Sequence, residues 1–254
     1  MTTPKAQGAL KQQVREYLSD TKSIVDECLK TCSSSAQFSE SFRISLATKS
    51  VLSGLTTSNL RPSLSLVQTI VLRIPMLSAI GQGSIAHAEF RRFLELLFWT
   101  IYFTDHSAEW AEFQKAKNGG FSRDQHKPIS FAANRELGYY VDYTAELMEN
   151  DPSGLGSQSV AALRTVIHEL NSNVHAGQIA KEQRKLVPYE NPDSVYLSKF
   201  VRLQRSVFSS SCIVLAAYKR QKFERLPAAA RANFDWLVGP VFRRKIRSGP
   251  FGNP

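Results

Sequence analysis

The sequence predicts an all-α protein folded as a single multi-helix bundle, and three observations support this. Apolar residues recur at the three-to-four-residue spacing of amphipathic helices along most of the chain. The alternating pattern of strands is nearly absent. The 254 residues, 43% of them apolar and 21% charged, have the composition of a globular protein. No repeat and no long linker divides them, so we expect one domain over 1–254.

We divide that domain into N-terminal helices (1–83), a core (84–225) and a basic C-terminal extension (226–254). The first helix, over 9–32, has a near-heptad apolar stripe. The stripe consists of Leu10, Val14, Leu18, Val25 and Leu29. A second helix follows the serine-rich break at 33–35 and extends to about residue 55. A third spans 63–77, where Pro75 must end or kink it.

The core begins with a helix over 85–103 that is apolar on most of its circumference, which is typical of a helix surrounded by others. Thr104 or Asp105 then caps a short helix. Two further helices are expected over 129–149 and from about 157 to 175. A long one runs from Asp193 or Ser194 to Arg225, and a last short helix is broken at Gly239-Pro240.

The positive charge is concentrated in the C-terminal part. Residues 1–198 are neutral overall, whereas 199–254 hold twelve basic side chains against two acidic ones and carry the whole net charge of +10. Clustered basic residues bind phosphates in a salt-sensitive, sequence-independent manner. The nucleic-acid-binding candidates are Arg220, Lys222, Arg243, Arg244, Lys245 and Arg247. Anionic lipid or an acidic protein would be attracted by the same charge, and a merely solvated basic face is the alternative.

Several classes of protein have no support in the sequence. Three cysteines without a signal-peptide pattern favour free thiols and a cytoplasmic location. The longest apolar run, 93–103, is too short to cross a membrane. The sequence lacks the zinc-binding motif of metalloproteases, the nucleophile-elbow motif of hydrolases, the phosphate-binding P-loop and the dinucleotide-binding motif. We therefore expect neither a metal nor a cofactor.

Two clusters of polar residues are candidates for a catalytic or binding site. Asp105, His106 and Glu109 form a compact cluster, for which helix capping by Asp105 is the simpler explanation. On the 157–175 helix, Arg164, His168, Asn171 and His175 are spaced +4, +3 and +4 and share one face. Arginine binds phosphate, histidine exchanges protons near neutral pH, and Asn171 and Asn173 can position a ligand. A solvated or interhelical polar face is the alternative.

The end of this helix, Leu-Asn-Ser-Asn-Val-His-Ala-Gly over 170–177, resembles the ending of the motif helix in HEPN-like helical proteins. The segment 89–97, in which Arg91 and Arg92 precede a core Glu95, is also similar to that family. The resemblance implies an HEPN-like fold for the core, a homodimer with facing motif helices, and an RNA-linked role in a bacterial defence or toxin-type system. Such systems also supply protein partners.

The resemblance leaves catalysis open. The positions where the family's ribonucleases carry an arginine before this histidine hold His168, Glu169 and Leu170, and the nearest arginine is Arg164. If the protein cleaves RNA, His175 would transfer the proton, His168 or Arg164 would stabilise the phosphorane, and no metal would be required. The competing hypothesis is a non-enzymatic helical adaptor that binds an acidic partner.

Overall fold

The computed structural model describes residues 4–55, 61–111, 136–174 and 194–239. All regular structure in these ranges is helical, which confirms the all-α prediction. The helices are α1 (Pro4–Ser33), α2 (Ala36–Leu55), α3 (Arg61–Ala79), α4 (Gly83–Asp105), α7 (Leu137–Glu149), α8 (Leu155–Val174), α10 (Ser194–Tyr218), α11 (Arg220–Glu224) and α12 (Ala228–Val238). A short turn of helix also follows α4, over 107–111.

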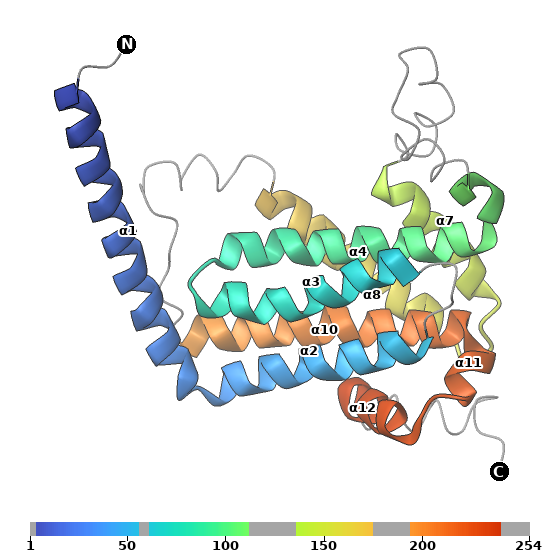
Figure 1. Ribbon diagram of the computed structural model, residues 1–254. Coiled ribbons are helices and arrows are strands. Elements are labelled where there is room, and N and C mark those ends of the chain that lie inside the picture. Colours follow the sequence, from blue (N-terminus) through green and yellow to red (C-terminus); the bar gives the residue numbers. More distant parts are fainter. Residues whose placement is uncertain (1–3, 56–60, 112–135, 175–193, 240–254) are drawn as a thin grey trace, which may run out of the picture.

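Helix α10 lies at the centre of the bundle. It packs against α2 and α8, while α3 lies between α2 and α4, and α7 contacts α4 and α8 (Figure 1). One continuous apolar core joins these helices with α12. Aromatic rings connect α4 to α10, because Phe208 lies with its ring centroid 4.9 Å from that of Phe93 and 5.7 Å from that of Phe90.

Pro75 does not end α3, which continues to Ala79. Proline has no backbone N–H, so the carbonyl of Val71, four residues earlier, lacks its usual donor. The hydroxyl of Ser45 on α2 donates to this carbonyl at 2.7 Å. Of the two outcomes expected at Pro75, an end or a kink, the end is therefore wrong, and a neighbouring helix supplies the missing donor.

The same serine belongs to a buried polar network around Gln204 of α10, which is fully buried. The Gln204 amide nitrogen donates to Ser45 Oγ at 2.8 Å and to the Ser41 carbonyl at 3.1 Å. Its amide oxygen accepts from Ser41 Oγ at 2.5 Å. Each polar group of this side chain therefore has a partner, as buried polar groups require, and α2, α3 and α10 are joined at one point.

The C-terminal helices are held against α2. A Cβ at Gly54 would collide with the buried side chain of Leu226, so glycine at this position allows the segment before α12 to approach α2 closely. The long helix predicted from residue 194 to 225 is divided at Lys219 into α10 and α11. Helix α12 ends at Val238, at the break predicted for Gly239-Pro240, and Gly239 follows it with a φ of 86°.

The remaining helix predictions agree with the described structure to within a few residues. The N-terminal part of the predicted 129–149 helix lies outside the described residues. Cys28, Cys32 and Cys212 are buried free thiols, and burial raises the pKa of the Cys212 thiol. None of the described helices combines the length and apolar character that a membrane span requires.

We predict that Gln204→Leu lowers the free energy of unfolding by about 2–4 kcal/mol, because it leaves buried hydroxyl and carbonyl groups without partners. Ser209→Ala is the matched control on the same helix, since the Ser209 hydroxyl bonds only within its own turn. Urea unfolding measures both. Equal stability of the two variants would contradict a structural role for the network.

Candidate functional site

The predicted polar stripe lies on α8, whose first turn is fixed by the turn over 151–154. Asp151 Oδ2 accepts from the Gly156 backbone N–H at 2.8 Å and Oδ1 accepts from that of Ser153 at 3.1 Å, while Gly154 has a φ of 63°. The buried face of α8 includes Leu163, Val166, Ile167 and Leu170, as the spacing predicted, together with Leu155 and Val160. The opposite face of α8 therefore points away from the core and can carry exposed polar side chains.

Arg164 and His168 are exposed one turn apart on this opposite face. The Arg164 guanidinium forms an ion pair with Asp142 of α7, and both side chains are more than half exposed. Exposed pairs of this kind add little stability. The structure thus places these two predicted residues together in solvent, next to a carboxylate that the sequence analysis did not associate with them.

The remaining side chains of the stripe lie outside the described part of the structure. Asn171 and Asn173 belong to the last turn of α8, but their side chains lie outside the described part of the structure, and His175 lies outside the described residues altogether. The proposed convergence of Arg164, His168 and His175 therefore stays a prediction.

Of the predicted basic residues, Arg220 and Lys222 lie in the described part of the structure. Arg220 donates to Glu224 within α11 at 3.3 Å, so its charge is partly neutralised by its neighbour. Lys222 is half-buried on the same short helix. The four candidates of the tail lie outside the described residues, and they are Arg243, Arg244, Lys245 and Arg247.

A cationic cluster that the sequence analysis missed lies where α12 crosses α2 and α10. The indole ring of Trp236 has the guanidinium of Arg43 4.1 Å from its centroid and that of Arg205 4.5 Å from it. Arg205 also pairs with Glu40 at 2.9 Å. Arg43 is exposed, so this group presents a fixed cation to solvent near the end of α12. We call Arg43, Arg205 and Trp236 the tryptophan stack.

Asp105 has a different role from the predicted N-cap. It is the last residue of α4, and its carboxylate accepts from the hydroxyls of Tyr218 at 2.6 Å and Tyr143 at 2.8 Å. Burial and these hydrogen bonds raise the pKa of both tyrosines. The capping interpretation was therefore wrong for Asp105, which instead joins the ends of α4 and α10 to α7.

The nearby His106 and Glu109 also have partners. The His106 ring stacks on Tyr102 with centroids 4.0 Å apart, and the Tyr102 hydroxyl donates to Glu109 at 3.1 Å. Lys219 lies over the Tyr218 ring at 4.0 Å, and burial lowers the pKa of this lysine. The polar groups of this cluster therefore hold helices together rather than forming an open reactive site.

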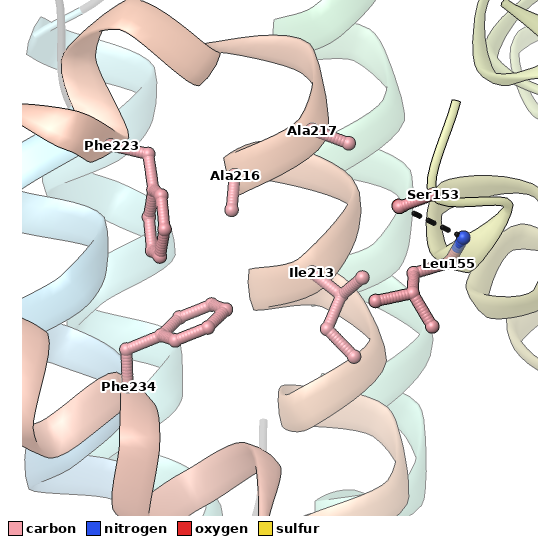
Figure 2. A pocket seen from close by; sticks show the side chains of 7 residues that line it. All are labelled: Ser153, Leu155, Ile213, Ala216, Ala217, Phe223 and Phe234. Atoms are coloured by element: carbon pink, nitrogen blue, oxygen red, sulfur yellow. Dashed lines mark hydrogen bonds between the residues drawn. The ribbon is translucent and has the colours of Figure 1, made fainter. Parts of the chain in front are cut away.

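Two hollows in the described part of the structure differ in shape, and neither resembles an enclosed ligand pocket. The first, between α10, α11, α12 and the turn before α8, has space of only about 10 Å³, enough for a single water (Figure 2). The second is an open groove of about 320 Å³ along α3. It is lined by Thr69, Leu72, Arg73, Met76, Leu77 and Ile80.

Arg73 in this groove pairs with Glu89 of α4 at 3.2 Å. Glu89 is the buried carboxylate of its segment, 7% exposed, and its Oε2 has no hydrogen-bond partner. Glu95, expected as the core glutamate, is instead partly exposed and pairs with Arg91 at 3.1 Å. The described residues contain no cluster of three or more side chains suited to a metal ion.

Comparison with known proteins adds no relative: no family model, curated protein or solved structure matches the chain.

We predict that the free energy of unfolding falls as the pH rises above 10. The raised pKa values of Tyr143 and Tyr218 mean that these tyrosines ionise in the unfolded chain, near their ordinary pKa of 10.0, before they ionise in the folded one. Their stabilising contribution is complete below that pH and declines above it. Urea unfolding between about pH 8 and 11 measures the decline.

The double variant Tyr143→Phe/Tyr218→Phe should show a shallower decline than wild type. Tyr139→Phe, an exposed position on the same helix as Tyr143, is the control; it should change the slope far less than the double variant, because the charge of Tyr139 is the smallest of the causes that raise the pKa of Tyr143. A double variant with the wild-type slope would show that the two hydroxyls are not coupled to folding.

Proposed function

We propose that this protein binds RNA or a similar polyanion with the basic surface of α10, α11 and α12 and the tail that follows, as an RNA-directed effector or RNA-binding component of a bacterial defence or toxin-type system. The observation that carries the proposal is the charge distribution. Twelve of the basic residues, and the entire excess of +10, lie in residues 199–254. A neutral remainder of the chain makes this segment the attractive surface for phosphates.

Two described basic residues of this segment are oriented by backbone carbonyls and form no ion pair with another described residue. Arg231 donates to the backbone carbonyls of Glu224 and Leu226, and Arg202 to that of Ser198. A carbonyl orients a guanidinium but does not cancel its charge. These arginines are therefore held in fixed positions with their positive charge intact, which lowers the entropic cost of binding a phosphate.

The tryptophan stack supports a continuous path from the bundle to the tail. Trp236 lies against the Arg43 guanidinium, and Arg43 is exposed to solvent next to the last turn of α12. Stacked arginines bind phosphates in defined geometry. Since the chain continues from Gly239 to Arg243 and Arg244, a nucleic-acid strand bound by the tail has a folded basic surface close to it.

Cleavage of RNA would be a second property of the protein, and it would depend on the predicted polar residues of α8 and its end. A histidine acting as base would take the proton of a ribose 2′-hydroxyl, the oxygen would attack the adjacent phosphorus, and the leaving 5′-oxygen would receive a proton. His175 is the candidate for these transfers, with His168 or Arg164 stabilising the phosphorane. The exposure of Arg164 and His168 in solvent supports access for an RNA strand.

The alternative is a helical adaptor without enzymatic activity. The open groove along α3 favours it, because Leu72, Met76 and Ile80 form an apolar surface of the kind that receives a partner helix. In that case the basic C-terminal surface would bind an acidic protein. Both hypotheses predict binding of polyanions, but only the first predicts that RNA is the ligand of highest affinity and that cleavage depends on His175.

The test is fluorescence anisotropy with a labelled single-stranded RNA at several salt concentrations. Binding should weaken steeply with salt, and reversing the charge of Arg243, Arg244 and Lys245 together should reduce the slope by roughly 0.7 for each phosphate that the variant no longer neutralises. Arg43→Glu should weaken binding as well. Arg92→Glu, an exposed position on α4, is the matched charge control.

An RNA affinity that does not change with salt concentration, or no binding at about 50 mM salt, would contradict the polyanion hypothesis. For cleavage, the same proteins are incubated with total RNA and EDTA. His175→Ala should abolish cleavage and leave anisotropy binding intact. Cleavage that persists in His175→Ala would remove this histidine from the reaction, and binding without any cleavage would favour an RNA-binding component over a nuclease.

A further inference from the structure

The outer side of α3 carries the open groove of about 320 Å³. Helix α3 lies between α2 and α4 at the surface of the bundle (Figure 1). Among the residues that line the groove, Leu72, Met76 and Ile80 recur every four residues, so they form one apolar line along the helix. Met76 is 46% exposed. Large apolar side chains in an exposed hollow are typical of an interaction site.

The shape of the groove fits a helix. Its lining residues run from Thr69 to Ile80, which corresponds to about 16 Å of helix, or three turns. Helices that bind in grooves present their apolar side chains at a similar spacing. None of the lining residues is aromatic, so the groove offers no ring on which a base of RNA could stack. A hollow of this kind also suits a rounded helix better than the flat surface of a bilayer.

The charges beside the groove on the α4 side are basic. Arg73 lines the groove and pairs with Glu89 of α4 at 3.2 Å, while its side chain stays 49% exposed. Helices α3 and α4 are joined by a short turn and pack along each other. Arg92 follows Glu89 by about one turn on the same side of α4, so it lies beside Thr69. Arg92 is exposed and forms no ion pair with another described residue.

The α2 side of the groove adds another basic residue. The Ser45 hydroxyl donates to the Val71 carbonyl of α3. Lys49 follows Ser45 by one turn on the same side of α2, so it lies near Leu72, and it is partly exposed. The sequence of α3 contains no acidic residue, and Glu89 is only 7% exposed. The groove therefore has an apolar floor between two basic edges, which is complementary to acidic side chains.

We propose that the groove along α3 binds an amphipathic helix of a partner protein whose apolar face is flanked by acidic residues. The partner's apolar side chains contact the apolar line of the groove, and its carboxylates face Lys49, Arg73 and Arg92. The ion pair with Glu89 engages one guanidinium nitrogen of Arg73, which leaves other N–H donors for a partner carboxylate. The inference goes beyond the proposed function and does not depend on it, since it needs no contact with RNA.

The test is fluorescence anisotropy of the full chain with two labelled synthetic helical peptides. Both carry leucines at the same positions along one face, and the flanking positions hold glutamates in one peptide and lysines in the other. The acidic peptide should bind with a Kd of about 10–100 micromolar, and the lysine peptide about tenfold more weakly. Equal affinities would overturn the proposal, because the basic edges would then select nothing.

Variants of the groove locate the binding site. Met76→Glu should weaken binding of the acidic peptide about tenfold, because it places a carboxylate in the apolar line. Arg92→Glu should weaken the acidic peptide and strengthen the lysine peptide, a reversal that a general loss of structure would not produce. Two matched controls should keep the wild-type affinity. They are Thr165→Glu, at an exposed position on α8, and Arg43→Glu, at an exposed position on the far side of α2.

Two results would move the binding elsewhere and overturn the proposal. Binding of the acidic peptide that survives Met76→Glu but is lost in Arg43→Glu would place it on the basic C-terminal surface. The second arm uses vesicles of phosphatidylcholine and phosphatidylglycerol. If wild type binds these vesicles, Met76→Glu does not, and neither binds the acidic peptide, the groove is a membrane-binding surface.

The labelled RNA separates this proposal from the proposed function. Arg92→Glu should keep the affinity for RNA while it loses the acidic peptide, and Arg43→Glu should show the opposite pattern. A failure of peptide binding can therefore be told apart from a failure of RNA binding. Circular dichroism of each variant verifies that the bundle is folded in every comparison.

Discussion

The missing backbone donor at Pro75 is the constraint on which the arrangement of the central helices depends. Without help from a neighbour, proline in the middle of α3 would leave the Val71 carbonyl buried and unpaired. Ser45 of α2 supplies the hydrogen and in turn accepts one from Gln204 of α10. A local defect in one helix is thereby corrected by two others, and these hydrogen bonds fix the register of the three helices.

This register determines where the charged residues of α10 lie. Arg205 is one residue from Gln204, and it contacts Glu40 at the start of α2 and the backbone at the end of α12. At the C-terminal end of α10, the Tyr218 hydroxyl donates a hydrogen bond to the Asp105 carboxylate of α4. Helix α10 is thus fixed by polar contacts at its middle and its end, so the basic residues that follow it begin from a defined position.

The sequence was sufficient for features that depend on local periodicity. Helix positions and the shared face of Arg164 and His168 follow from residue spacing alone, and the structure agrees with them. Features that depend on distant partners were not predictable in this way. Tyr218 is 113 residues from Asp105, so the first-turn pattern of Asp105 and Glu109 suggested a cap. Similarly, nothing near Pro75 in the sequence indicates that a serine of another helix will supply its missing donor.

The tryptophan stack illustrates the same limit for function. Its members come from α2, α10 and α12, and nothing in the sequence brings the three together. Clustered basic residues could be recognised from the sequence, but the folded surface at the start of the tail could not. The sequence offered only a partial signal, which is the presence of an aromatic residue, Trp236, within a basic segment.

The dependence of α3 on Ser45 is tested most directly by a double-mutant cycle between Ser45 and Pro75. Ser45→Ala should lower the free energy of unfolding by about 1–3 kcal/mol in the wild-type background. In a Pro75→Ala background, the new backbone N–H can donate to the Val71 carbonyl, so the same serine substitution should cost less by about 1 kcal/mol. An equal cost in both backgrounds would show that Ser45 does not replace the donor that proline lacks.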